Sequence, residues 1–141
     1  MDLTADDRLA IIELCGLACH ALDFNDPDGF AGLFVPGGAF QRQASQRAGG
    51  QIIFRHEGHD QLREFAKTMS ALRGGLTRHW TANIVITPTS TGARATSYTM
   101  LVANEADPKA VGILVAGTYQ DVFEKTGNGW RFASRTVVDD V

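Results

Sequence analysis

The spacing of apolar residues changes along the chain, from a helical period in the first half to long strand-like segments in the second. After Thr4, a residue suited to cap a helix, apolar residues recur every three or four positions as far as Asp23, which predicts an amphipathic helix. Asp26-Pro27 is typical of a second helix start, and this short helix is predicted to run through Leu33-Phe34. The apolar stripe of the first helix consists of Leu9, Ile12, Cys15, Gly16, Cys19 and Leu22.

Two short strands and a third helix are predicted next. The segments Ala39–Ala44 and Gln51–Arg55 flank a polar, glycine-containing stretch and are typical of strands, and Val35–Gly38 is predicted to be a turn. Residues His59–Leu72 have apolar side chains at helical spacing, and Gly74-Gly75 provides a helix end.

Four long segments rich in β-branched and aromatic residues make up the second half. Helices followed by a run of hairpin strands predict an α+β fold, in which an antiparallel meander is covered on one face by helices. No repeat or low-complexity tract interrupts the sequence, so we expect one domain over residues 1–141. The four predicted strands are Thr77–Thr87, Arg94–Ala103, Val111–Glu124 and Trp130–Val138.

Composition and charge exclude several classes of function. With 44% hydrophobic and 21% charged residues, the chain has the composition of a globular domain. Its 13 basic and 16 acidic side chains give a net charge of −3, which argues against a nucleic-acid partner. No apolar run approaches the ~20 residues of a membrane helix, and we see no secretory signal. Two cysteines, Cys15 and Cys19, do not form a disulfide framework, so we expect a soluble, cytoplasmic protein.

Asp23 is the most informative position for function. On a helical wheel it lies in the middle of the predicted apolar face, at the C-terminal end of the helix, where burial and the helix dipole both disfavour a negative charge. One interpretation is a turn aspartate that bonds its own backbone. Because Asp26 already caps the next helix, the other interpretation is a buried carboxylate with a partner, an environment that tunes a general base.

His79 is the natural partner for that carboxylate. Strand alternation places His79 on a polar face with Thr77, Thr81 and Asn83. That face is either solvated or lines a pocket. In the second case the opposite, apolar face needs cover, and we expect a homodimer or homotrimer through this open sheet face. The apolar face carries Trp80, Ala82, Ile84 and Ile86, and the Val111–Val115 segment adds to it.

The remaining motifs give weaker signals for chemistry. His56-Glu57-Gly58-His59 resembles a metal-ligand spacing, but a glycine separates the histidines and no third ligand is evident, so surface polar residues are the favoured interpretation. Cys15 and Cys19 are favoured as core thiols, since His20 lies on another side of the helix. We therefore expect no metal and no cofactor. The phenylalanines are predicted core residues, some of which also contact a ligand.

Motifs along nearly the whole chain resemble one known family. They are Leu22-Asp23, Leu33-Phe34, Gly58–Leu62, Arg78–Asn83, Ala116–Tyr119 and Gly129–Phe132. This set is similar to the SnoaL-like branch of the NTF2-like superfamily, which contains scytalone dehydratase and hexachlorocyclohexane dehydrochlorinase. The resemblance implies a cone-shaped α+β fold, with a curved antiparallel sheet and about three helices packed on its concave face.

The resemblance also implies the kind of site. It places an Asp–His dyad, Asp23 and His79, against a mainly apolar pocket with Phe40 in its wall and Arg135 within reach. The dehydratases of this group have a tyrosine five residues before the aspartate, where this chain has Ala18. A reaction that needs this hydrogen-bond donor must find it elsewhere; the candidates are Asn83, Tyr98, Tyr119 and Arg135.

These features together predict a lyase of the dehydratase type, acting without a cofactor on a small hydrophobic, cyclic substrate. His79 would accept a proton from carbon, and Asp23 would hold the imidazole; which member of the pair is the base stays open. The alternatives are an isomerase similar to ketosteroid isomerase or polyketide cyclases, a non-catalytic binding module, and a structural subunit similar to the β subunits of ring-hydroxylating dioxygenases. The predicted substrate contacts are Phe40, Phe54, Phe65, Asn83, Tyr98 and Arg135.

Overall fold

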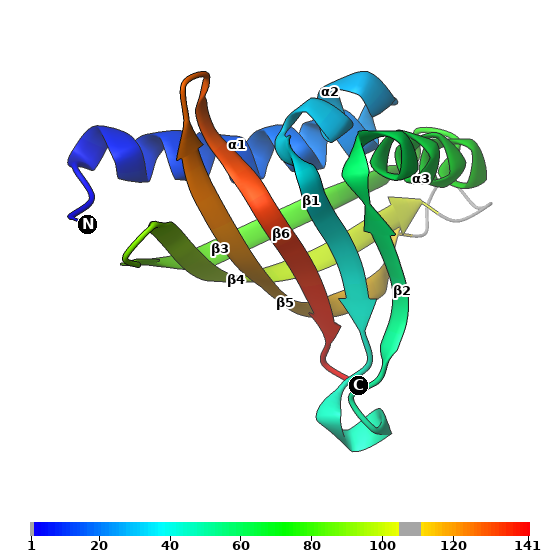
Figure 1. Ribbon diagram of the computed structural model, residues 1–141. Helices are drawn as coiled ribbons and strands as arrows, with labels where there is room; N and C mark the ends of the chain where they lie inside the picture. Colours follow the sequence, from blue (N-terminus) through cyan, green and yellow to red (C-terminus); the bar gives the residue numbers. More distant parts are fainter. Residues whose placement is uncertain (1, 105–110) are drawn as a thin grey trace.

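The computed structural model describes residues 2–104 and 111–141, and this part of the chain forms three α-helices and one six-stranded sheet (Figure 1). The α+β prediction is confirmed. The helices lie together over one side of a strongly curved sheet whose order is β2-β1-β6-β5-β4-β3. In chain order the elements are α1 (Ala5–Asp23), α2 (Pro27–Gly32), β1 (Phe34–Gln43), the 3-10 turn η1 (Gln46–Ala48), β2 (Ile52–Glu57), α3 (Gly58–Arg73), β3 (Thr77–Pro88), β4 (Gly92–Asn104), β5 (Val111–Thr126) and β6 (Gly129–Asp139).

The sheet is mixed, whereas the sequence predicted an antiparallel one. Strand β1 pairs in parallel with β6, with Phe40 opposite Arg135, and all other neighbours are antiparallel. The last four strands pair with their neighbours in the sequence, whereas β1 pairs with β6, at the other end of the chain. Contacts of this kind leave no mark in the periodicity of either strand, because alternation is the same in parallel and antiparallel partners.

The predicted turn at Val35–Gly38 is part of β1. It interrupts the ladder, since the β1–β6 register shifts between Phe34 and Ala39. Gly38 allows this close approach, because a Cβ there would lie 2.9 Å from the Phe34 Cβ and 3.0 Å from the Phe132 carbonyl oxygen. Helix α2 accordingly ends at Gly32, before the predicted end at Phe34.

The buried face of α1 differs from the predicted stripe. Leu9 and Ile12 are 64% and 45% exposed, and the buried face is centred about one residue, or about 100°, away from Ile12. The helix start explains this rotation. Asp7 closes a capping box with Thr4 and accepts hydrogen bonds from the Lys125 Nζ and the Trp130 Nε1 at 2.7 and 2.9 Å. The buried residues of α1 are Asp7, Ile11, Leu14, Cys15, Ala18, Cys19, Ala21 and Asp23.

A β-bulge at Asn83 reverses the face of strand β3. Asn83 has a φ of 56°, and the β3–β4 register shifts between Ala82 and Val85. Asparagine tolerates this left-handed conformation better than most residues, and a bulge moves the following side chains to the other face. Ile84 and Ile86 therefore pack against the core, where unbroken alternation had predicted an exposed face, and Val85 is exposed.

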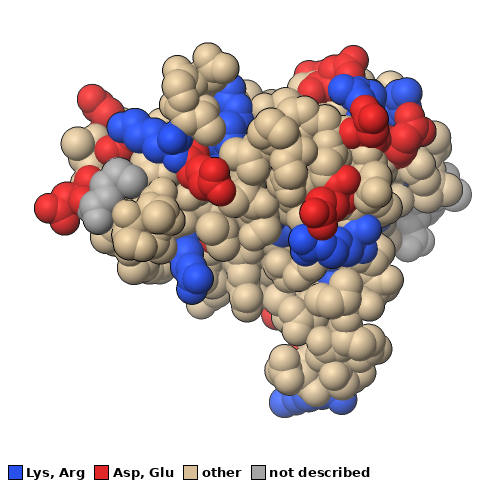
Figure 2. Space-filling view, viewed as in Figure 1, with Lys and Arg blue, Asp and Glu red and all other residues tan. Residues whose placement is uncertain are grey.

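Charged side chains of both signs mix on the surface of the molecule (Figure 2). Over α2 and α3, for example, Arg63 pairs with Asp28 and Asp60. Pairs of this kind balance one another locally, and the face shown carries no broad basic patch. No helix in residues 2–104 and 111–141 is long and apolar enough to cross a membrane.

Candidate functional site

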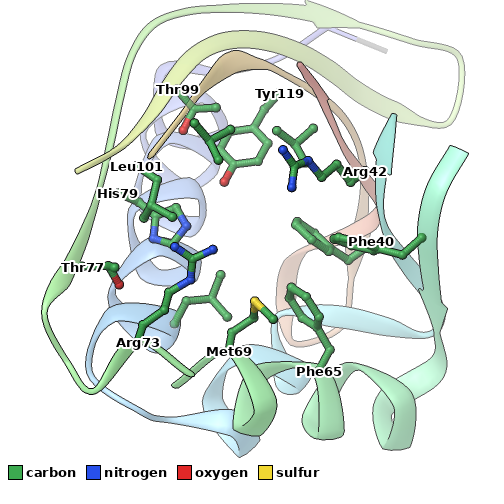
Figure 3. Close-up of a pocket in the computed structure, with 14 residues that line it drawn as sticks. Phe40, Arg42, Phe65, Met69, Arg73, Thr77, His79, Thr99, Leu101 and Tyr119 are labelled. Carbon is green, nitrogen blue, oxygen red and sulfur yellow. The ribbon is translucent and has the colours of Figure 1, made fainter. Parts of the chain in front are cut away.

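A cavity of about 190 Å³ lies between α3, the end of α1 and the sheet (Figure 3). Its size slightly exceeds the ~150 Å³ of an engineered cavity that binds benzene, so one substituted ring fits. The walls are mostly apolar, with a small number of polar groups, as in small-molecule sites. The lining residues are Leu22, Phe40, Arg42, Phe54, Phe65, Met69, Arg73, Thr77, His79, Thr99, Leu101, Val115, Tyr119 and Val137.

Asp23 and His79 are in direct contact at one side of this cavity. The Asp23 Oδ1 lies 2.6 Å from the His79 Nδ1, and the Asp23 Oδ2 accepts the backbone N–H of His79 at 2.9 Å. Asp23 ends α1 and His79 lies near the start of β3, so the contact ties these two elements together. The side chains are 4% and 16% exposed, respectively. Both oxygens of the carboxylate are therefore committed to one residue.

This contact determines which nitrogen of His79 is available for chemistry. An ionised carboxylate only accepts hydrogen bonds, so the Nδ1 carries the hydrogen in the pair. The Nε2 of the neutral ring is then an acceptor, on the ring edge away from Asp23. Because His79 lines the cavity, this nitrogen is the group that can take a proton from a bound molecule.

Three phenylalanines form an aromatic wall of the cavity, and two of them, Phe40 and Phe65, lie across from His79 in Figure 3. Phe40, Phe54 and Phe65 come from β1, β2 and α3, and their ring centroids are 5.0–5.9 Å apart. The His56 ring packs on Phe65 at 4.9 Å, and burial lowers the pKa of His56. A flat apolar ring inserted here would face aromatic surface on one side and the His79 imidazole on the other.

Three of the predicted substrate contacts lie outside the cavity lining. Asn83 is exposed at the bulge of β3. Tyr98 is 59% exposed on the outer face of the sheet, because its neighbour Thr99 takes the inward position on β4. Arg135 is only 2% exposed and lies under Tyr119, whose ring centroid is 3.9 Å from the guanidinium carbon. These three residues therefore do not line this cavity, and their contact with a substrate stays a prediction.

Arg135 instead belongs to a buried ion pair behind the cavity. Its Nε and Nη2 donate to the two carboxylate oxygens of Asp121 at 2.9 and 2.8 Å. Burial opposes the charge, but Asp121, with smaller contributions from Cys15 and Tyr119, outweighs it, so that the pKa of Arg135 is raised well above its usual value. Burial also raises the pKa of the Tyr119 hydroxyl, which is hydrogen-bonded to Thr99. Tyr119 thus presents a neutral phenol to the cavity, at a position where the sequence suggested a donor.

Sequence reasoning did not select two cavity residues, Arg42 and Arg73. Both had a detectable signal. Arg42 is two positions after Phe40 on β1 and so shares its face, and Arg73 is four positions after Met69 on α3. Arginine is usually expected on the solvent side of an element, so neither residue was predicted to lie on the buried face.

The weaker motifs do not form metal sites. The His59 Nε2 contacts the Phe34 carbonyl oxygen at 2.9 Å, and Cys15 and Cys19 are free thiols in the core. Within the described ranges, 2–104 and 111–141, no group of three or more His, Cys, Asp or Glu side chains is arranged to hold a metal ion.

Known proteins share the sequence features and the fold of this chain. The SnoaL-like domain family matches it over residues 3–136. A Mycobacterium tuberculosis protein of unknown function is 27% identical, with a TM-score of 0.80, and the match covers 95% of this chain and 72% of the other. A search of curated protein sequences found no match.

Two structures from Novosphingobium aromaticivorans resemble the chain at lower identity. A candidate scytalone dehydratase is 23% identical, with a TM-score of 0.73 over 98% of this chain and 89% of the other. The β subunit of a candidate aromatic-ring-hydroxylating dioxygenase is 24% identical, with a TM-score of 0.76 over 94% of this chain and 88% of the other. At these identities the likeness shows the fold alone.

Proposed function

Because the chain belongs to the SnoaL-like domain family and has the NTF2-like α+β fold, we propose that it is a lyase of the dehydratase type, acting without a cofactor on a small hydrophobic, cyclic substrate. The observation that carries the proposal is the 2.6 Å contact between Asp23 and His79 at the wall of a ring-sized cavity. The same site supports an isomerase if no group leaves the substrate.

The reaction begins with a proton transfer from carbon to the His79 Nε2. The carbon lies next to an electron-withdrawing group, and the electron pair of its C–H bond forms a double bond as hydroxide leaves from the neighbouring carbon. The proton held by His79 then passes to the hydroxide, which departs as water and regenerates the neutral imidazole. Asp23 holds the ring tautomer and stabilises the imidazolium while the proton is there.

Proton exchange with solvent tests this step before the substrate is known. We expect the protein to catalyse deuterium incorporation from D2O at the activated carbon of small cyclic ketones or β-hydroxy ketones, followed by ¹H NMR, and His79→Ala to abolish that catalysis. Catalysed loss of water in the same samples would mark a dehydratase, and exchange alone an isomerase. Binding of these compounds without exchange above the uncatalysed rate would contradict the proposal and favour a binding module.

We also propose that copies of the chain associate through the outer face of the sheet. Trp80 and Tyr98 are 61% and 59% exposed there and lie together with Met100, Ala82 and Ala116. Large exposed aromatic residues grouped in this way are typical of a protein–protein interface. Apolar area left in water disfavours the monomer.

The outer face makes a prediction about oligomeric state. Wild-type protein is expected to sediment as a dimer or trimer at micromolar concentration, and Trp80→Glu as a monomer, since the change places a charge in the contact. Leu72→Glu is the matched control, because Leu72 is an apolar residue on α3 that is also largely exposed. A monomeric wild type in analytical ultracentrifugation would rule the interface out.

A further inference from the structure

Two guanidinium groups line the cavity, although most of its wall is apolar. Arg42 enters from β1 and Arg73 from the last residue of α3. In Figure 3, Arg73 lies on the same side of the cavity as His79, and Arg42 lies across from them beside Phe40. Cationic side chains are rarely directed at apolar cavities without a partner, so each of them requires an explanation.

Arg42 has its partner within the protein. Its Nε donates to both oxygens of Asp139 at 3.0 and 3.1 Å, and its Nη2 lies 2.9 Å from the Asp139 Oδ2. This bidentate pair neutralises Arg42 and holds it in place at the cavity wall. Arg42 thus shapes the site and contributes polarity, while its positive charge is already compensated.

Arg73 is different. Among the described residues it has no hydrogen-bond or ion-pair partner, and burial and the charge of Arg42 lower its pKa, partly offset by Asp23. Asp23 makes no hydrogen bond or ion pair with Arg73, and each of its oxygens is already in contact with His79. The position of Arg73 at the C-terminal end of α3 is favourable for a cation, but this explains the charge and not its orientation toward the cavity.

The donors of Arg73 match one class of ligand group. A planar guanidinium binds a carboxylate through two parallel N–H···O contacts, and such charge-assisted bonds are stronger than neutral ones. A ligand anion at this place would supply the partner that the protein does not. The anion would lie on the His79 side of the cavity, with the aromatic wall of Phe40 and Phe65 available for the rest of the molecule.

We propose that the substrate is a small ring compound that carries a carboxylate, and that Arg73 binds this carboxylate. Its ring lies against the aromatic wall, and this orientation brings a carbon near the carboxylate to His79. Arg73 is in this respect a residue that determines substrate specificity. The inference rests on the proposed function only in using the same cavity, since carboxylate binding is measurable without turnover.

A pair of probes that differ in charge but hardly in shape tests the inference. Titrations of the wild-type protein with 4-methylbenzoate and 4-methylbenzamide, followed by ¹H–¹⁵N NMR, are expected to show at least about tenfold tighter binding of the benzoate. Arg73→Gln is expected to reduce benzoate affinity to that of the benzamide and to leave benzamide affinity unchanged. Arg94→Gln is the matched control, because it removes the same charge at an exposed position on β4.

Several outcomes would overturn the inference. These are equal affinity of the two probes for the wild-type protein, unchanged benzoate affinity in Arg73→Gln, and no binding of either probe. None of them would affect the proton-exchange test of His79, so the two proposals fail separately. If Arg73→Gln does not fold, salt replaces the variant: added NaCl is expected to weaken binding of the benzoate and not of the benzamide, and an equal effect on both would count against the carboxylate.

Discussion

Replacement of His79 by alanine is expected to lower kcat by roughly 10²–10⁴-fold, the usual contribution of a positioned general base. The imidazole lines the cavity, and its Nδ1 lies 2.6 Å from the Asp23 Oδ1, which leaves the Nε2 as the nitrogen that can take a proton. Its removal leaves the cavity and the aromatic wall in place. The rate is measured on the compound that shows proton exchange, and the folded state is checked by thermal unfolding.

Asp23→Asn tests the same proton transfer with a smaller change in structure. The amide keeps an oxygen that can accept the backbone N–H of His79, a bond that Asp23→Ala would lose. What changes is the contact with the His79 Nδ1, where the amide brings no negative charge and can offer an N–H in place of an acceptor, so that the imidazole is held in the wrong tautomer. We therefore expect a loss of kcat comparable to that of His79→Ala, with little change in melting temperature.

A matched histidine variant separates chemistry from general damage. His20→Ala removes an exposed imidazole of α1 that is outside the cavity lining, and its activity is expected to equal that of the wild type. Near-normal kcat in either Asp23→Asn or His79→Ala would show that the pair does not carry the proton transfer. The cavity would then be a binding site whose chemistry, if any, lies with other residues.

The second large effect is on stability: Asp121→Ala is expected to lower the free energy of unfolding by about 3–5 kcal/mol. Arg135 is 2% exposed, and its Nε and Nη2 bind the Asp121 carboxylate at 2.9 and 2.8 Å. Removing the carboxylate leaves a buried cation without its ion-pair partner. The thiol of Cys15, 3.9 Å from the Asp121 Oδ2, offers no replacement charge, because burial raises its pKa to about 12 and keeps it protonated.

A double variant is the control for this prediction. Asp121→Leu combined with Arg135→Met replaces both charges with apolar side chains, and buried ion pairs exchanged in this way often leave stability unchanged or higher. We therefore expect the double variant to unfold near the wild-type midpoint in urea, well above Asp121→Ala. If Asp121→Ala lowers the free energy of unfolding by less than about 1 kcal/mol, the ion pair is not isolated from water, and Arg135 must contact water or another anion.

Much of the site followed from residues whose local context is unusual. Asp23, a carboxylate at the end of an amphipathic helix, and His79, on the polar face of a strand, were predicted to be buried partners. The two side chains are in contact. Phe40, Phe54 and Phe65 line the cavity as expected. Asn83, Tyr98 and Arg135 lie outside the cavity lining for three physical reasons: a bulge, a choice between two faces of β4, and an ion pair with a residue fourteen positions away.

The sequence by itself determined the local features of this protein: the capped start of α1, the Asp-Pro start of α2, the order of helices and hairpin strands, and the family. Each of these features depends on hydrogen bonds and side-chain preferences within a few residues, so the short segment that forms it is enough to predict it. Only the tertiary structure decided the parallel β1–β6 pair, the rotation of α1 and the position of Arg73 at the cavity. Those features depend on contacts between residues far apart in the chain, and periodicity does not encode which distant surfaces meet.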